Sequence, residues 1–453
     1  MSEVKNAMIK HLILFFSCCI AGYPGNAQQA ASPDTVAFTL DQCIAYAMRH
    51  EPTLNQAILN QAVTKSTNAI SLAGWWPQLN ASGNLQHYIQ QPTTFVSNGT
   101  GGFTKEKTGV VNTFIPTLSV TQAIFSPALL SAARIAPLYE KAALQITDST
   151  QIGIVSNVSK NFYGLLLTLE QINVLREDTA RLDKNLSDTY HQYVGGLVDE
   201  TDYDEASIEL NNSKAQLKQQ VENVVPQYAV LKQSMGFPPD SQFNVLFDTA
   251  QMTRDVAFDT TQTLQYEKRI EFQQLQTAKN IQQQTTRYYN NAWLPTLSAF
   301  YDYNYEFESN TASNLFGSSY PNSYVGLSLS IPIFTGFART QSVRRSRLQE
   351  RELDFEQVRL VSEIYSEYTS ALANYKGNYY NLEMMEQNTE LARRTYNIVA
   401  LQYKQGVVAY LNVITAESNL ITSEIGYLNA LFQLLSSKID LEKAMGFIPY
   451  TNR

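Results

Sequence analysis

The sequence lacks long apolar segments, has few cysteines and carries no excess of positive charge, and each lack excludes a class of protein. The longest apolar stretch, Leu12–Ile20, is well below the ~20 residues that a spanning helix needs, so a membrane-crossing chain of this sequence would have to use a β-barrel. Only Cys43 of the three cysteines lies beyond residue 19, which leaves no pair for an internal disulfide in a processed chain. With 33 Lys and Arg against 41 Asp and Glu, no electrostatic footprint for nucleic acid is present.

Side chains that carry catalysis are also scarce. The four histidines do not have the spacing of metal ligands. No phosphate-binding loop, nucleophile elbow or Cys/His pair in a catalytic context occurs. The sequence therefore predicts neither an enzyme nor a metal or cofactor site.

The N-terminus has the pattern of a secretory signal peptide. Two lysines precede the apolar stretch Leu12–Ile20, and small residues follow it at 25–28. This order predicts a signal peptide over residues 1–27. Two alternatives stay open, namely a short membrane anchor and lipidation at Cys18 or Cys19.

The strongest internal feature is a duplication with an offset of about 210 residues. It predicts two structural repeats, residues 28–240 and 258–453, joined by a linker or equatorial element at 241–257, each with a helix, a β-hairpin and a long helical hairpin. The motifs that recur in the same order are Trp75-Trp76-Pro77 with Trp293-Leu294-Pro295, Gly196-Leu197-Val198 with Gly406-Val407-Val408, and Met235-Gly236-Phe237 with Met445-Gly446-Phe447.

Each repeat contains two segments in which apolar and polar residues alternate, which is typical of a strand with one apolar face. In the second repeat they cover Leu297–Phe307 and Val325–Ile333, on either side of a polar loop at Ser309–Pro321. The first repeat has them near 79–89 and 114–125, around the loop Asn98–Gly102. The chain should therefore supply about four strands.

After each hairpin the apolar residues recur every three or four positions, which predicts long helices. Continuous helices over Pro127–Val194 and Phe337–Gln405 would each span on the order of 100 Å at ~1.5 Å per residue. Each ends at glycine, after which a second helix returns. We expect Pro137 and Pro226 to bend or break these helices, and residues 238–261 to form a short strand and helix outside them.

Four strands cannot close a barrel, because single-chain outer-membrane barrels begin at ~8 strands. Their open edges would also leave backbone groups unpaired in lipid, at several kcal/mol each. Several copies of the chain would therefore have to share one barrel.

The sequence resembles the TolC family of outer-membrane efflux proteins over nearly all of the residues that follow the predicted signal peptide. The resemblance rests on Tyr193–Val198 with Thr201 and Asp202, on Tyr403 with Gly406, and on the Trp/Pro and Met-Gly-Phe motifs in their duplicated order. It implies a mainly α-helical chain with a membrane β-barrel part, assembled as a homotrimer with a shared twelve-stranded β-barrel and a periplasmic α-barrel.

The same resemblance implies the exit duct of a tripartite efflux pump or type I secretion system. Such a duct lies in the outer membrane, extends into the periplasm and passively conducts substrates. Its partners would be outer-membrane lipid, a periplasmic adaptor (membrane fusion) protein and an inner-membrane RND, ABC or MFS transporter. No cofactor or enzymatic step is implied.

In this family the tips of the helical hairpins contact the adaptor and close the pore. The family often has a carboxylate pair where this chain has Asn412 and Thr415, and a basic residue where it has Val408, so an aspartate gate is in doubt at these positions. The tip residues to which the resemblance extends are Tyr193, Gly195, Gly196, Leu197, Asp199, Glu200, Asp202, Tyr403, Gly406, Val407, Asn412 and Thr415.

Acidic residues gather after the first glycine turn, at positions 199, 200, 202, 204 and 205. Repeated around a pore, they would favour cations; alternatively they are ordinary acidic residues at the positive end of a helix dipole. Trp75, Trp76 and Trp293 lie at the expected helix-to-strand transitions, where they form either a membrane-interface belt or packing between helix and barrel.

Two other functions remain as alternatives. A periplasmic coiled-coil adaptor or structural protein would also contain long antiparallel helices, but it would not need two amphipathic β-hairpins. An envelope enzyme would need convergent polar groups in a pocket.

Overall fold

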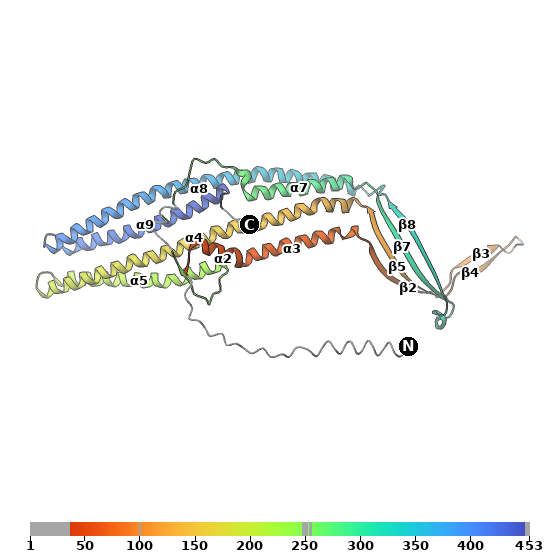
Figure 1. Cartoon of the computed structure of the whole chain (residues 1–453), viewed down its shortest axis with the longest axis horizontal. Helices are drawn as coiled ribbons and strands as arrows, with labels where there is room; N and C mark the ends of the chain where they lie inside the picture. The colour runs from red at the N-terminus through yellow and green to blue at the C-terminus, as the bar shows by residue number, and fades with distance from the viewer. Residues whose placement is uncertain (1–36, 98, 100, 247–251, 253–255, 449–453) are drawn as a thin grey trace.

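The computed structural model describes residues 37–97, 99, 101–246, 252 and 256–448. The predicted signal peptide, with Cys18 and Cys19, lies outside the described residues. The molecule is long and narrow, with long helices along most of its length and a β-sheet at one end (Figure 1). No helix among these residues is long and apolar enough to cross a membrane.

The first half of the chain runs from helix to sheet and back to helix. The long helix α4 begins with Ser126 as N-cap and proline at its first position, a combination that favours helix initiation because proline has no N–H to leave unpaired. The elements are β1 (Ala37–Phe38), α2 (Leu40–His50), α3 (Pro52–Leu72), the 3-10 turn η1 (Ala73–Trp75), β2 (Gln78–His87), β3 (Thr93–Ser97), β4 (Phe103–Lys107), β5 (Asn112–Phe125), α4 (Pro127–Val194) and α5 (Glu200–Met235).

The second half repeats this order. The short strand β6 (Asn244–Val245) precedes it and pairs in parallel with β1, which confirms the predicted strand in 238–261. The predicted helix stays a prediction, because residues 247–251 and 253–255 of this segment lie outside the described residues. The other elements are η2 (Tyr266–Lys268), α7 (Ile270–Asn291), β7 (Thr296–Ser309), η3 (Ala312–Asn314), β8 (Ser319–Ser330), α8 (Ala338–Lys404) and α9 (Tyr410–Met445).

The four main strands form one antiparallel sheet in the order β2-β5-β7-β8. It contains the two predicted hairpins, β2–β5 and β7–β8, and β5 pairs with β7 to join them. Register places apolar side chains in a row across one face, in Leu79, Val120, Tyr301 and Val325. A polar row crosses the other face at Ser82, Thr117, Asn304 and Asn322. In it the Thr117 hydroxyl donates to Asn304 Oδ1 at 2.7 Å, and Asn304 Nδ2 donates to Asn322 Oδ1 at 2.8 Å. The sheet therefore has one apolar and one polar face.

Two strand predictions were wrong in detail. The segment between β2 and β5 contains a further hairpin, β3–β4, which projects beyond the sheet in Figure 1; of the predicted loop, Asn98 and Thr100 lie outside the described residues. Strand β8 begins at Ser319 and ends at Ser330, so Ile331 and Ile333 are not part of it. Pairing with β7 decides this boundary, because β7 begins at Thr296, opposite Ser330.

The predicted long helices are confirmed, with 68 residues in α4 and 67 in α8. Pro137 and Pro226 do not break these helices, because both lie inside continuous helices; that they bend them stays a prediction. A proline removes one backbone hydrogen bond at a cost of ~3 kcal/mol. Packing of the neighbouring turns offsets this cost, since α4 contacts α2, α3, α5, α7 and α9 along its length.

The main core lies midway along the helices, where α2, α4, α5 and α9 meet (Figure 1). A second, smaller cluster near the helical end of the molecule joins Ala206 of α5 to Tyr410 and Val413 of α9. The side chains of the main core that are at most 1% exposed are Cys43, Ala47, Leu54, Val158, Leu165, Leu166, Leu231, Met235, Leu434, Leu441 and Ala444.

Candidate functional site: the hairpin tips and the buried network beside them

The two hairpin turns at the helical end have the same backbone. In the first, Leu197 N–H donates to Gln192 O at 2.8 Å and Gly196 N–H to Tyr193 O at 2.9 Å. In the second, Val407 donates to Gln402 O at 2.9 Å and Gly406 to Tyr403 O at 2.8 Å. Both are Schellman motifs, which satisfy the last helix carbonyls.

Glycine is required in each motif at the residue with left-handed backbone. Gly196 has φ 70° and Gly406 has φ 71°, and nothing lies within 4 Å of where a Cβ would be. A side chain there would be strained by the backbone conformation rather than by a neighbour. The duplicated glycines therefore form the two tips.

A small cluster holds the two tips side by side. The Tyr403 hydroxyl of α8 donates to Gln192 Oε1 of α4 at 2.8 Å, and its ring lies 5.3 Å from that of Tyr410. Tyr410 is 1% exposed and packs with Ala206 and Val413. The first and second hairpins are thus joined near their ends by a direct hydrogen bond and by apolar contact.

The other tip residues lie on the surface. Tyr193 stacks on Tyr203 with ring centroids 6.1 Å apart. Leu197 and Val407 are 79% and 67% exposed, and Asn412 and Thr415 face solvent on the first turns of α9.

The acidic group occupies the start of α5. Asp199 is its N-cap residue, without a side-chain capping bond, and Glu200 and Asp202 lie in the first turn. This position is the one that a helix dipole favours for carboxylates.

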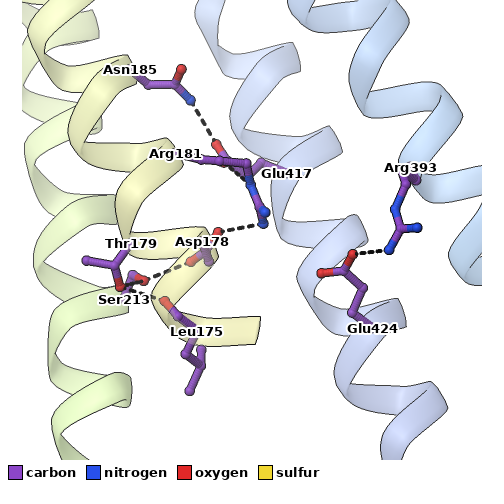
Figure 2. A network of polar contacts seen from close by, with 9 residues as sticks. All are labelled: Leu175, Asp178, Thr179, Arg181, Asn185, Ser213, Arg393, Glu417 and Glu424. Atoms are coloured by element: carbon purple, nitrogen blue, oxygen red, sulfur yellow. Dashed lines mark hydrogen bonds and ion pairs between the residues drawn. The ribbon is translucent and has the colours of Figure 1, made fainter. Parts of the chain in front are cut away.

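A buried polar network, which the sequence reasoning missed, lies behind the tips. Figure 2 shows Arg181 of α4 between Asp178 of the same helix and Glu417 of α9. Arg181 lies 3.4 Å from Asp178 Oδ1 and its Nε lies 3.5 Å from Glu417 Oε1. Both carboxylate side chains are only 2% exposed.

Further bonds fix the outer atoms of this network. Asn185 Nδ2 donates to Glu417 Oε2 at 3.1 Å, and the Ser213 hydroxyl of α5 donates to Asp178 Oδ2 at 2.8 Å. The geometry between Arg181 Nε and Glu417 Oε1 does not make a hydrogen bond, and neither atom has another partner among the described residues. Glu417 is therefore the less well satisfied carboxylate.

Burial and charge raise the pKa of both acids. Burial raises the pKa of Glu417 to about 7, helped by the negative charge of Asp178 and opposed by Arg181 and Asn185. Burial also raises the pKa of Asp178, with Ser213 and Arg181 opposing. These shifts follow from placing two carboxylates and one guanidinium in a poorly hydrated contact.

A groove of about 430 Å³ runs beside the network. Its walls come from α4, α5 and α9, and they include Asp178, Glu209, Ser213 and Glu417. Both carboxylates line this groove, although their side chains are almost fully buried. The sequence did contain a signal for them, because Glu417 interrupts the apolar spacing of Val413 and Leu420.

The three tryptophans lie at the helix-to-strand transitions, far from the tips. Trp75 ends η1, Trp76 precedes β2 and Trp293 precedes β7. Trp76 is 73% and Trp293 54% exposed, so packing within one chain covers neither ring completely.

Comparison with known proteins identifies the family. The family model described as outer membrane efflux protein matches residues 44–236 and 266–447. The chain belongs to the outer membrane efflux protein family. This confirms the resemblance stated from the sequence and the expected location in the outer membrane.

A characterised outer membrane protein matches part of the chain. The outer membrane protein TolC of Vibrio cholerae is 22% identical over 214 residues, which are 46% of this chain and 48% of the relative. The match thus spans about half the length of that relative.

Two solved structures have the same fold over nearly the full chain. The CmeC outer membrane channel of Campylobacter jejuni has a TM-score of 0.71 at 16% identity, over 96% of this chain and 94% of its own. The open state of the MtrE outer membrane channel of Neisseria gonorrhoeae has a TM-score of 0.68 at 17% identity, over 90% and 88%. Both structures are described as outer membrane channels, and at these identities the likeness shows a shared fold.

Proposed function

We propose that the chain is one subunit of a homotrimeric channel that forms the exit duct of a tripartite efflux pump or type I secretion system. In this proposal an inner-membrane RND, ABC or MFS transporter delivers substrates through a periplasmic adaptor, and the channel conducts them passively. Each repeat contributes two strands and one helical hairpin to the wall of the channel. The repeats are residues 28–240 and 258–453, and the element 241–257 lies between them in the sequence.

The open sheet is the observation that carries this proposal. Among the described residues, strands β2 and β8 are each paired on one side only, and a sheet edge exposed to lipid costs several kcal/mol per unpaired group. Three copies would join β8 of one chain to β2 of the next and close a barrel of twelve strands, above the ~8 that closure needs. The apolar face would then contact lipid and the polar face the lumen.

Apolar side chains support this orientation. On the apolar face Leu79 is 65%, Val325 78% and Leu327 67% exposed in the single chain. The apolar band of an outer-membrane barrel is flanked by aromatic residues at the interfaces. In this orientation Trp75, Trp76 and Trp293, at the helix-to-strand transitions, would lie at the periplasmic interface of the membrane.

The exposed tips suit a docking site. Leu197 and Val407 are exposed at the turns of the two hairpins. The acidic first turn of α5 follows Leu197, and the first turns of α9, with the polar residues Asn412 and Thr415, follow Val407. Since the hydrogen bond between Tyr403 and Gln192 joins both tips, it would break when an adaptor binds and the pore opens.

Cross-linking of the two sheet edges tests the proposal. Asn84→Cys on β2 is combined with Tyr320→Cys, Asn322→Cys or Tyr324→Cys on β8, one at a time, in a background without the three native cysteines. Within one chain these edges are three strand spacings apart, about 14 Å, which is beyond the ~7 Å that a disulfide spans.

At least one pair should give a covalent trimer after oxidation, with no larger species. The single variants should stay monomeric on a denaturing gel. A purely monomeric outcome for all three pairs, in membranes that contain the protein, would contradict the shared barrel.

A further inference from the structure

The buried network joins two parts of the molecule that must separate if the tips are to move. Arg181 and Asp178 belong to α4, and Glu417 belongs to α9, seven residues after that helix begins at Tyr410. Seven residues correspond to about 10 Å of helix. Contacts at Glu417 therefore hold α9 against α4 just behind its tip.

The charge balance of this contact depends on one proton. With both carboxylates ionised, two buried negative charges share one guanidinium, and the contact carries a net charge of −1. With one carboxyl protonated, the same three groups are neutral. Because a buried charge without a full partner is costly, the neutral form favours close packing of the two helices.

Charges on the surrounding helices do not supply the missing cation. On α9, Glu424 is paired with Arg393 of α8 at 2.8 Å (Figure 2). On α5, Glu209 lines the groove and adds negative charge. The hydroxyls of Tyr396 and Tyr410 also face Glu417, and burial raises the pKa of each above its ordinary value, so both stay uncharged.

We propose that Asp178, Arg181 and Glu417 form a proton-dependent latch between α4 and α9, packed when one carboxyl is protonated and loosened when both are ionised. The groove between α4, α5 and α9, which Asp178 and Glu417 line, gives α9 space to shift. That loosening opens the channel rests on the proposed function; the latch itself does not.

The direction of the pH effect follows from the higher pKa in the packed state. Glu417 has a pKa of about 7 when packed, against 4.5 for a hydrated carboxyl. The packed state therefore binds more protons, and it loses stability as pH rises from about 4.5 to about 7 and no further. Between pH 5 and pH 8 the ratio of loosened to packed molecules should rise by up to about a hundredfold.

Spin-label distances measure the latch directly. The full chain, without its native cysteines, receives labels at Lys184→Cys on α4 and Asn419→Cys on α9, both of which are exposed. In detergent, the α4–α9 distance distribution should be narrow at pH 5 and longer or broader at pH 8. A distribution that does not change with pH would overturn the latch.

Matched variants locate the effect. Glu417→Gln keeps the shape of the side chain but cannot ionise, so it should keep the pH 5 distribution at both pH values. Asp440→Asn removes a half-exposed carboxylate that pairs with Lys160 across the same two helices, and it should behave as the unmodified chain does. A pH response that survives in Glu417→Gln, or disappears in Asp440→Asn, would contradict the latch.

A second variant tests the latch if Glu417→Gln does not fold. Asp178→Asn leaves Arg181 to Glu417 alone, so the contact is neutral when Glu417 is ionised and should stay packed at pH 8; a distance distribution that still becomes longer or broader at pH 8 would contradict the proposal. Channel recordings separate the two proposals, since open probability should rise with pH in the unmodified protein and not in Glu417→Gln. If distances respond to pH but no conductance is found, the channel function fails and the latch stands.

Discussion

Helices α4 and α8 occupy equivalent places in the duplicated chain and differ by one residue in length, but they are packed differently. Helix α4 has buried side chains along most of its length, whereas only Ser346, Ile364, Ala371, Tyr375 and Leu382 are buried in α8. Helices α2, α3, α5, α7 and α9 pack against α4, whereas α8 packs mainly against α7 and α9. The first helix is central in the chain and the second is peripheral.

The duplication therefore gives the two helices nearly the same length but not the same packing partners. Helix α8 exposes large apolar side chains, among them Phe355 at 76% and Val358 at 68%. Exposed apolar area of this kind marks an interaction surface. In the proposed trimer a neighbouring subunit covers it, and α8 then has the packing that α4 finds within one chain.

The largest expected effect is a core substitution in α4. Leu166→Ala, at a fully buried position, should lower the free energy of unfolding by about 2–5 kcal/mol. Val358→Ala on α8 should change that of the dissociated chain by less than about 0.5 kcal/mol. Denaturant titration followed by helical circular dichroism compares them, and equal costs would remove the distinction between the two helices.

A charge on the exposed face of α8 should act on assembly instead. Phe355→Asp should weaken subunit association by about 2 kcal/mol or more, as expected for a buried aromatic anchor, while the isolated chain keeps its helical content. Mass measurement in detergent over a dilution series reports this. Phe355→Leu keeps an apolar side chain and should assemble normally; full assembly of the Asp variant would show that α8 faces solvent.

The two glycine turns have the same backbone conformation, so the same substitution should lower the stability of the protein equally in both. Gly196→Ala and Gly406→Ala should each cost about 1 kcal/mol because of their positive φ. Gly153→Ala in α4, where nothing crowds a new Cβ, should instead stabilise by up to about 1 kcal/mol. Thermal unfolding in detergent orders the three, and a stabilised Gly406→Ala variant would contradict the duplicated turn.

The smallest expected effect concerns the bond that joins the two halves at the tips. Tyr403→Phe removes the hydroxyl that donates to Gln192 and should cost about 1 kcal/mol or less. It should raise the open probability of single channels without changing their full conductance. An unchanged open probability would mean that the bond does not hold the tips.

Much of the fold could be predicted from the sequence, because the repeated glycine and Trp/Pro motifs mark the same boundaries twice. The ends of α4 were predicted to the residue, since proline at Pro127 favours the start of a helix and the glycines at 195 and 196 favour its end. The hairpin β3–β4 was missed because its two strands have only five residues each and show no sustained alternation of apolar and polar residues.

The site could be predicted only at the turns. Gly196, Gly406 and Tyr403 lie in motifs that are visible in sequence, and the structure brings them to one end of the molecule. Asp178 and Glu417 are 239 positions apart and meet only because α9 packs on α4. No local pattern records that contact, although each carboxylate interrupts an apolar spacing.

The central claim is that the chain works as a trimeric channel, and its most direct test measures mass and conductance on one sample. The protein is extracted from outer membranes in mild detergent, its mass is determined, and the same fraction is added to a planar bilayer. The account predicts a particle of three chains that conducts in discrete steps. A monomer that remains soluble without detergent and does not conduct would contradict it.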